Sequence, residues 1–201
     1  GVNWYAPSLS SHSEAGGSDW TIEEYIELLS VGISERAVAS GPMATIVGQS
    51  LQHLSPEDIR AMAVYLKSLT ENENEAPLSA YALVIPEKIQ LSLDQGGKLY
   101  ESYCKTCHGE SGEGEPGIYP PLAGNQSVIM DSPINTIRSV LYGGYPATTA
   151  GNPRPYGMPP FQQIFLDNDV ALVVSYIRNA WGNSGGHVTA VDVDRSRGGD
   201  H

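Results

Sequence analysis

The chain has 201 residues, enough for one or two small domains, and a formal net charge of −12 from 23 acidic and 11 basic residues. This acidity argues against binding to nucleic acid or to anionic lipid, and it permits steering toward a basic patch on a partner protein. No apolar run approaches the roughly 20 residues that span a bilayer. The chain opens on Gly1 without a signal peptide, so we expect a processed or truncated product.

The first half of the chain contains two predicted helices separated by a loop. Residues 26–32 are apolar at helical spacing and end in a glycine stop. A loop carrying Met43 follows, and Ser55 then marks the start of the second helix as its cap, with Pro56 at the first helical position. The second helix, residues 58–69, has an acid near its start and a base near its end, as the helix dipole favours.

This unit recurs in the second half of the chain. Residues 137–143 repeat the first helix with its glycine stop, residues 169–180 repeat the closing helix, and Met158 takes the place of Met43. The second copy has an additional front half, residues 91–125, that the first copy lacks. The predicted organisation is a partial module at 1–70, a linker at 71–90, a complete module at 91–183 and a flexible tail at 184–201.

The additional front half contains the sequence Cys104-Lys105-Thr106-Cys107-His108, which fits the attachment pattern of a c-type haem. Residues three apart share one face of a helix, so both sulfurs can reach the two vinyl groups of one porphyrin. The histidine that follows directly can offer a ring nitrogen to the iron. The sequence therefore predicts one covalently bound haem c.

Three other roles for the cysteine pair account less well for the motif. A zinc site usually needs a second pair of Cys or His ligands at a characteristic spacing, and the sequence has none. A redox-active dithiol favours a strand–helix–strand setting, which this helix-and-loop pattern lacks. A plain disulfide across two residues is possible but leaves the adjacent histidine unexplained.

Met158 is the leading candidate for the second axial ligand of the iron. It lies in a Pro- and Gly-rich loop, residues 155–161, where prolines stiffen the chain and Gly157 allows a close backbone approach. The alternative is that Met158 only fills the core. His187 is a second possible ligand in the Gly-rich tail. Met43 has no attachment motif upstream, so we expect no second haem within this chain.

Helical spacing also predicts how the complete module closes. Gly96, Tyr100 and Cys104 fall on one helical face at four-residue steps, and Val173 and Tyr176 lie one turn apart on the last helix. A glycine opposite an aromatic side chain allows two helices to cross closely. We therefore expect this crossing to close the module around the haem.

Residues 91–183 resemble a class I bacterial cytochrome c domain. They are most similar to the C-terminal domain of the multi-haem cytochrome c subunits that serve bacterial membrane-bound dehydrogenases of the alcohol type. The stretches that carry this resemblance are Gly97-Lys98-Leu99-Tyr100, Cys104-Lys105-Thr106-Cys107-His108-Gly109, Tyr119-Pro120-Pro121-Leu122-Ala123-Gly124-Asn125, Pro155-Tyr156-Gly157-Met158-Pro159-Pro160-Phe161 and Tyr176-Ile177-Arg178-Asn179-Ala180-Trp181-Gly182-Asn183. Residues 1–70 resemble the latter part of the preceding domain in that family, through Trp20, Gly41-Pro42-Met43 and Tyr65-Leu66-Lys67-Ser68-Leu69.

The resemblance implies an all-α fold with long Gly- and Pro-rich loops around the haem, preceded by a partial cytochrome c-like helical half-module. By the family pattern, the Pro121 carbonyl accepts a hydrogen bond from the second ring nitrogen of His108. Tyr156 and Arg154, which flank the Met158 loop, are candidates for contacts with the haem edge or the propionates. The family carries three haems and this chain has one attachment motif. The chain is therefore a fragment of a longer polypeptide, a divergent relative, or the partner of a chain that supplies the missing half.

The function implied by the resemblance is electron transfer from a periplasmic dehydrogenase to the respiratory chain, through a haem with His and Met ligands. The expected partners are the catalytic subunit of that dehydrogenase or another redox protein. The expected location is the periplasm, free or at the membrane surface. The alternative is a haem enzyme or ligand sensor with one axial position open. A further possibility is that residues 1–70 serve as a docking module for a larger complex.

Overall fold

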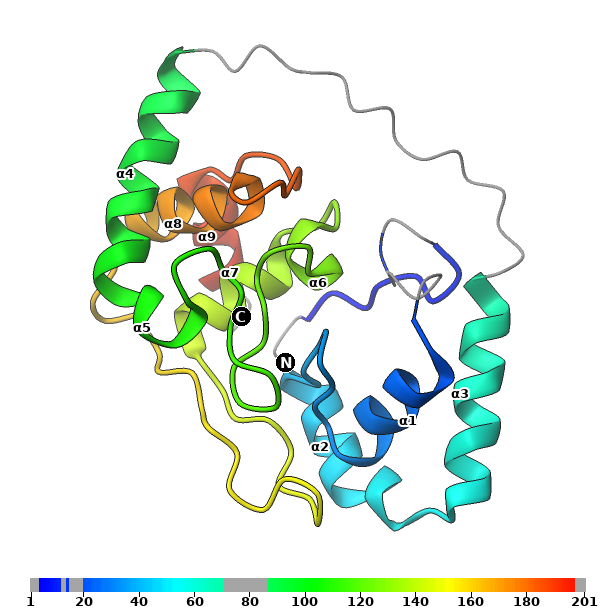
Figure 1. Ribbon diagram of the computed structural model, residues 1–201. Helices are drawn as coiled ribbons and strands as arrows, with labels where there is room; N and C mark the ends of the chain where they lie inside the picture. Colours follow the sequence, from blue (N-terminus) through cyan, green and yellow to red (C-terminus); the bar gives the residue numbers. More distant parts are fainter. Residues whose placement is uncertain (1–3, 12–13, 15–19, 71–86, 198–201) are drawn as a thin grey trace.

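The computed structural model describes residues 4–11, 14, 20–70 and 87–197, and helices joined by long loops make up this part of the chain (Figure 1). The extended pairings among these residues are isolated antiparallel bridges, and none of them forms a strand. The predicted all-α fold class is therefore confirmed.

The first unit holds α1 (Ile22–Ser30), α2 (Gly41–Gln49), a short 3-10 helix η2 (Leu51–His53) and α3 (Pro56–Thr70). Helix α3 begins at Pro56, where the sequence predicts, whereas α1 begins at Ile22, before the predicted range. The expected loop at Met43 is wrong, because Met43 lies in the first turn of α2. The backbone N–H of Asp58 donates to the Ser55 hydroxyl at 3.1 Å, which caps α3. A small apolar core forms between the helices, from Leu29, Ala39, Ala44, Val47, Leu51 and Ile59, with Ala147 of the second unit added to it.

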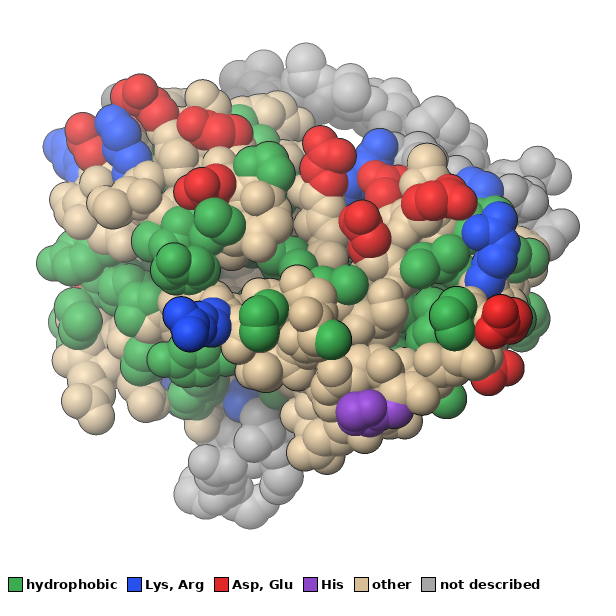
Figure 2. Space-filling view, turned by 60° about the horizontal axis from the view of Figure 1, so that its bottom comes forward, with side chains coloured by type: hydrophobic (Ala, Val, Ile, Leu, Met, Phe, Trp, Pro, Cys, Tyr) green, Lys and Arg blue, Asp and Glu red, His purple; other side chains and the backbone are tan. Residues whose placement is uncertain are grey.

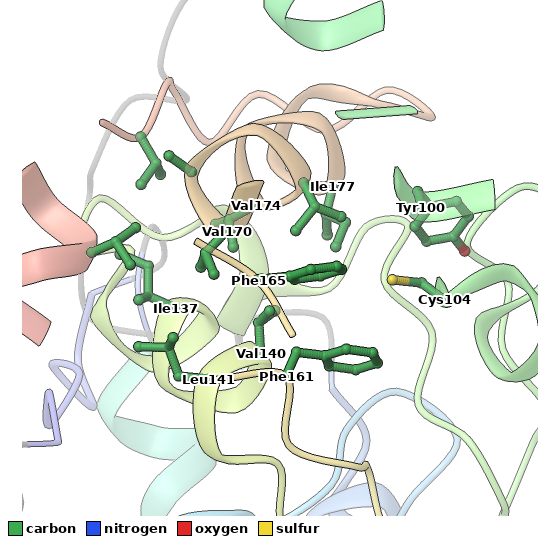
Figure 3. Close-up of a cluster of buried hydrophobic side chains, with 14 of the residues drawn as sticks. Tyr100, Cys104, Ile137, Val140, Leu141, Phe161, Phe165, Val170, Val174 and Ile177 are labelled. Carbon is green, nitrogen blue, oxygen red and sulfur yellow. The ribbon is translucent and has the colours of Figure 1, made fainter. Parts of the chain in front are cut away.

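The second unit holds the remaining helices. They are α4 (Glu87–Tyr103), α5 (Lys105–His108), α6 (Gln126–Ile129), α7 (Ile134–Tyr142), α8 (Asp167–Asn179) and α9 (Ala190–Arg197). Valine, isoleucine and leucine side chains of α7 and α8 fill the centre of its core, and Phe161, Phe165, Tyr100 and Cys104 line one side (Figure 3). Valines and isoleucines are fully buried there, including Ile137 and Val173 at 0% exposure. Two residues of the predicted site contact this core, since Cys104 belongs to it and Met158 packs against it.

Helices α4 and α8 cross at Gly96, as the spacing predicts (Figure 1). A Cβ atom at Gly96 would collide with the backbone carbonyl of Leu172 and would lie 2.8 Å from the Cβ of Tyr176. The ring of Tyr176 also covers Gly97, where an added Cβ would meet it at 3.1 Å. The absence of side chains at the two glycines is what lets the helices approach so closely.

The predicted flexible tail is wrong for residues 184–197. Val188 is 1% exposed and Val193 is 0% exposed, and both belong to the core of the second unit. The Thr189 hydroxyl accepts a hydrogen bond from the N–H of Asp192 at 3.3 Å, which starts α9. Because glycines precede α9, the sequence pattern did not indicate that Thr189 caps this helix or that Val188 and Val193 are buried. Residues 198–201 lie outside the described residues.

The predicted linker is too long at its C-terminal end. Residues 71–86 lie outside the described residues, whereas residues 87–90 form the first turn of α4. The boundaries of the two modules otherwise remain predictions. Among the described residues, no helix combines the length and the apolar character needed to cross a membrane.

An N-terminal arm, residues 4–11, packs against both units. The N–H of Tyr5 donates to the side-chain oxygen of Asn135 on α7, and the Asn135 amide donates back to the Tyr5 carbonyl, both at 2.9 Å. The Trp4 ring lies between Gly41 of α2 and the guanidinium of Arg138, whose carbon is 5.6 Å from the ring centroid. The arm therefore contacts both units.

Candidate haem site

The two cysteines and the histidine form one tight helical turn at the end of α4. The N–H of Cys104 donates to the Tyr100 carbonyl at 2.9 Å, and the N–H groups of Cys107 and His108 donate to the Cys104 carbonyl at 3.2 and 3.0 Å. Cys104 is buried and Cys107 is half-buried, and no disulfide joins them. Burial, and secondarily Cys107, raises the pKa of the Cys104 thiol to about 11, so this thiol stays protonated near neutral pH.

The imidazole of His108 has a fixed orientation. Its Nδ1 atom lies 3.2 Å from the carbonyl oxygen of Pro120 and must be the donor, because a carbonyl can only accept. Burial lowers the pKa of His108, with the bond to Pro120 acting in the opposite direction as the smaller effect. Burial favours a neutral ring, and the bond to Pro120 keeps its proton on Nδ1 and leaves the Nε2 lone pair available to a metal.

The predicted partner of His108, the Pro121 carbonyl, is wrong by one residue. The structure uses Pro120, and the Pro121 carbonyl instead accepts a hydrogen bond from the Asn125 side chain at 2.8 Å. Asn125 caps α6, since its side-chain oxygen accepts from the N–H of Ser127. The capping residue Asn125 therefore donates a hydrogen bond to the Pro121 carbonyl, and the Pro120 carbonyl accepts from the His108 imidazole.

Asn183 supports this loop and was not singled out by the sequence. Its side-chain amide donates to the carbonyls of Leu122 and Ile177 at 2.9 and 2.8 Å, and its oxygen accepts from the N–H of Gly124 at 2.8 Å. These bonds tie the loop that follows Pro120 to the end of α8. The only sequence signal was its place in the Trp-Gly-Asn stretch after that helix.

Met158 lies on a second loop that packs against the same core. Its N–H donates to the Gly144 carbonyl at 2.8 Å, and the N–H of Gly144 donates to the Met158 carbonyl at 3.0 Å. The half-buried side chain contacts the cluster that contains Cys104 and Phe161. In Figure 3, the sulfur of Cys104 points toward the side of the core lined by Phe161 and Phe165.

The remaining candidates lie at the rim of the site or away from it. Tyr156 is 60% exposed, and its ring centroid lies 5.7 Å from that of Tyr119. Arg154 is exposed, and within the described part of the chain it makes no hydrogen bond or ion pair. His187 is exposed in the segment between α8 and α9. The structure therefore does not favour His187 as a ligand from the core.

Aromatic side chains surround the motif more extensively than the sequence analysis indicated. Tyr100 lies 5.6 Å from Tyr176 and 4.9 Å from Trp181, measured between ring centroids, and its hydroxyl donates to the Gly109 carbonyl at 2.7 Å. Burial raises the pKa of Tyr100, so the hydroxyl stays neutral. Phe161 and Phe165 stack at 5.1 Å on the other side of Cys104. An apolar lining of this kind suits a large planar ring.

The donor set fits a haem better than it fits a bare metal ion. The described residues contain no group of three or more His, Cys, Asp or Glu side chains placed to hold a metal ion. The two thiols and the imidazole therefore do not converge on one point, as a zinc site would require. Two sulfurs, one oriented imidazole nitrogen and one thioether beside an aromatic core instead match the attachment and ligation of a haem c.

Charge around the motif is mostly negative and exposed. Lys105 pairs with Glu110 at 2.9 Å, and the N–H of Ser111 donates to the Glu113 carboxylate at 2.7 Å. On the face drawn in Figure 2, acidic side chains gather mainly along the upper part, and much of the remaining surface is hydrophobic or uncharged. This surface offers little to a polyanion.

The cytochrome c family profile matches residues 93–181, which include the motif, Met158 and all of α8. Cytochrome c-552 of Thermus thermophilus is 33% identical over 93 residues, which is 44% of this chain and 70% of that protein. The chain belongs to the class I c-type cytochromes. This membership implies a covalently bound haem c and electron transfer as the activity.

Longer relatives match almost the whole chain. The cytochrome c subunit of the quinone alcohol dehydrogenase of Gluconobacter oxydans is 35% identical over 199 residues, which is 97% of this chain and 41% of the relative. The cytochrome c subunit of the gluconate 2-dehydrogenase of Pantoea cypripedii is 31% identical over 194 residues, which is 94% of this chain and 44% of the relative. This cytochrome therefore spans less than half the length of these dehydrogenase subunits.

Proposed function

We propose that this cytochrome holds one haem c through thioether bonds to Cys104 and Cys107, with His108 and Met158 as the axial ligands. In this role it relays electrons from a periplasmic dehydrogenase toward the respiratory chain. The hydrogen bond from His108 Nδ1 to Pro120 is the observation that carries the proposal. It orients the ring and makes Nε2 the free nitrogen in a lining that is otherwise aromatic and aliphatic.

The residues around the motif would each have a distinct role in tuning or shielding the haem. A haem c supplies one-electron chemistry at its iron. The bond to Pro120 raises the basicity of the His108 nitrogen, and a methionine thioether as the opposite ligand raises the reduction potential. Phe161 and Tyr100 keep water from the apolar side of the site. No acid–base pair is required for such a role.

The nature of the longer relatives supports a dehydrogenase partner. They are named as cytochrome subunits of alcohol, fructose and gluconate dehydrogenases. We propose that this chain likewise accepts electrons from a catalytic subunit in the periplasm, free or at the membrane surface. Residues 1–70 would be completed by a further segment or chain. Met43 is half-buried against the core of that first unit, as a packing residue would be.

Replacing Met158 by alanine is expected to remove one axial ligand. The ferric protein should lose the near-infrared absorption band of methionine-ligated haem and should bind added imidazole readily. Its reduction potential should fall by on the order of 100 mV, a modest part of the roughly 0.8 V range set by axial ligands. Absorption spectroscopy and a redox titration of the holoprotein measure both effects.

Met43→Ala is the matched control, because Met43 is the corresponding methionine of the unit without an attachment motif. It should leave the spectrum and the potential unchanged. If Met158→Ala also leaves both unchanged, Met158 is not a ligand, and a haem enzyme or sensor with an open axial position becomes the better account of the protein.

A further inference from the structure

The loop that carries Met158 is a long hairpin anchored at its base. We define the Met158 hairpin as residues 143–158. Its two ends are joined by the paired backbone hydrogen bonds between Gly144 and Met158. Gly143 has φ +61°, and a side chain there would collide with the Met158 carbonyl. The base is therefore closely packed, and Met158 sits at its last residue.

The tip of the Met158 hairpin, which contains Ala147, Thr148 and Thr149, is inserted into the first unit. That unit has no haem attachment motif. In Figure 1 the yellow hairpin extends away from the second unit and ends beside α2 and η2. Ala147 is 4% exposed and is a member of the core of the first unit. A Cβ atom at Gly32 would lie 3.1 Å from the Ala147 Cβ, and one at Gly48 would lie 3.7 Å from it.

Polar contacts fix the tip in this position. The Thr149 hydroxyl donates to the Val31 carbonyl at 2.9 Å and accepts from the N–H of Asn152 at 3.1 Å. Thr149 is 4% exposed, so this bond is shielded from water. The Gln52 side-chain amide donates to the Thr148 carbonyl at 3.3 Å. We call the first-unit residues that receive the tip the socket, and they are Val31, Gly32, Val47, Gly48 and Gln52.

We propose that the socket positions Met158, with Ala147 and Thr149 as the positioning residues. The inference rests on the proposed function, because it assumes that Met158 ligates the iron. Pro153 and Pro155 stiffen the chain between the tip and Met158, so a displacement at one end is transmitted to the other. With tip and base both fixed, the backbone at Met158 is restrained beside the site. The socket thus disfavours displacements of the hairpin that would carry Met158 away from the iron, and methionine dissociation becomes rarer.

The test is the rate at which excess imidazole displaces methionine from the ferric holoprotein, read from the loss of the methionine–iron absorption band. Thr149→Val removes the two hydrogen bonds of the hydroxyl, to the Val31 carbonyl and from the N–H of Asn152, and should raise the limiting rate about fivefold. Ala147→Leu overfills the socket and should raise it about tenfold or more. Thr149→Ser keeps the hydroxyl and should restore a rate near that of the unaltered protein.

Two control variants lie on the same hairpin. The side chains of Thr148 and Ala150 are exposed, so Thr148→Val and Ala150→Leu make the same chemical changes outside the socket and should leave the rate unchanged. Val193→Ala weakens the core of the second unit at α9, away from the hairpin, and should not raise the rate. This last control separates a positioning effect from a general loss of stability.

The outcomes separate this inference from the proposed function. If Met158→Ala leaves the absorption band unchanged, Met158 is not a ligand and both ideas fail. If Met158→Ala removes the band while Thr149→Val and Ala147→Leu exchange at the rates of their controls, the ligand assignment stands and the positioning role is wrong. Should Ala147→Leu fail to fold, Gln52→Ala weakens the same socket from the other side. It must then raise the rate for the inference to hold.

Discussion

Replacing Gly96 by alanine is expected to destabilise the holoprotein by on the order of 2 kcal/mol or more. The added Cβ would collide with the Leu172 carbonyl, which belongs to the backbone of α8 and cannot turn aside. Helix propensity alone predicts the opposite sign, a gain of up to about 1 kcal/mol for alanine over glycine in a helix. Chemical denaturation gives the free energy of unfolding.

Gln95→Ala is the control for this change, because Gln95 is the exposed neighbour of Gly96 on the same helix. Its effect should stay within about 0.5 kcal/mol. A stabilised Gly96→Ala variant would mean that α4 and α8 do not cross as closely as described. The α4–α8 crossing would then not be what closes the unit around its site.

Replacing Arg178 by methionine is expected to destabilise the holoprotein by about 3 kcal/mol or more. The side chain is 2% exposed, and its guanidinium donates to the carbonyls of Val128 and Met130 at 2.7 and 2.9 Å. Longer hydrogen bonds reach the carbonyls of Gly186 and Asp131. Methionine fills a similar volume but leaves these acceptors without a donor.

Arg195→Met is the matched control, since Arg195 is exposed on α9 and the substitution removes the same charge. The control should change the free energy of unfolding by less than about 0.5 kcal/mol. Equal effects from the two variants would contradict the role given to the buried guanidinium. Thermal and chemical denaturation of both variants in the haem-loaded state provide the comparison.

The sequence alone was sufficient for features set by local spacing. The Cys104–His108 turn, the Ser55 cap and the glycine stops depend on residues within one or two helical turns of each other. When residues 58–69 are aligned with residues 169–180, Lys67 and Arg178 take the same position, and each is a base near the end of its helix. The alignment did not indicate that both donate to backbone carbonyls of an earlier segment, Trp20 for Lys67 and the α6 region for Arg178.

Features that depend on contacts between distant segments could not be predicted. Which of two adjacent prolines faces His108 is decided by Asn125, whose role follows from the start of α6. Residues 184–197 have a defined structure because Val188 and Val193 pack onto the core. The glycine-rich composition of this segment predicted a flexible tail instead. The insertion of Ala147 into the first unit joins residues more than ninety positions apart, so no local pattern could signal it.

The intact mass of the chain, produced with the cytochrome c maturation machinery, tests the central claim most directly. The expected mass is that of the polypeptide plus one haem, and the haem should remain after extraction with acidified organic solvent. Cys104→Ser combined with Cys107→Ser should release it. A mass equal to the bare polypeptide, a haem that the solvent removes from the unaltered chain, or a second haem would each contradict a single covalent haem at Cys104 and Cys107.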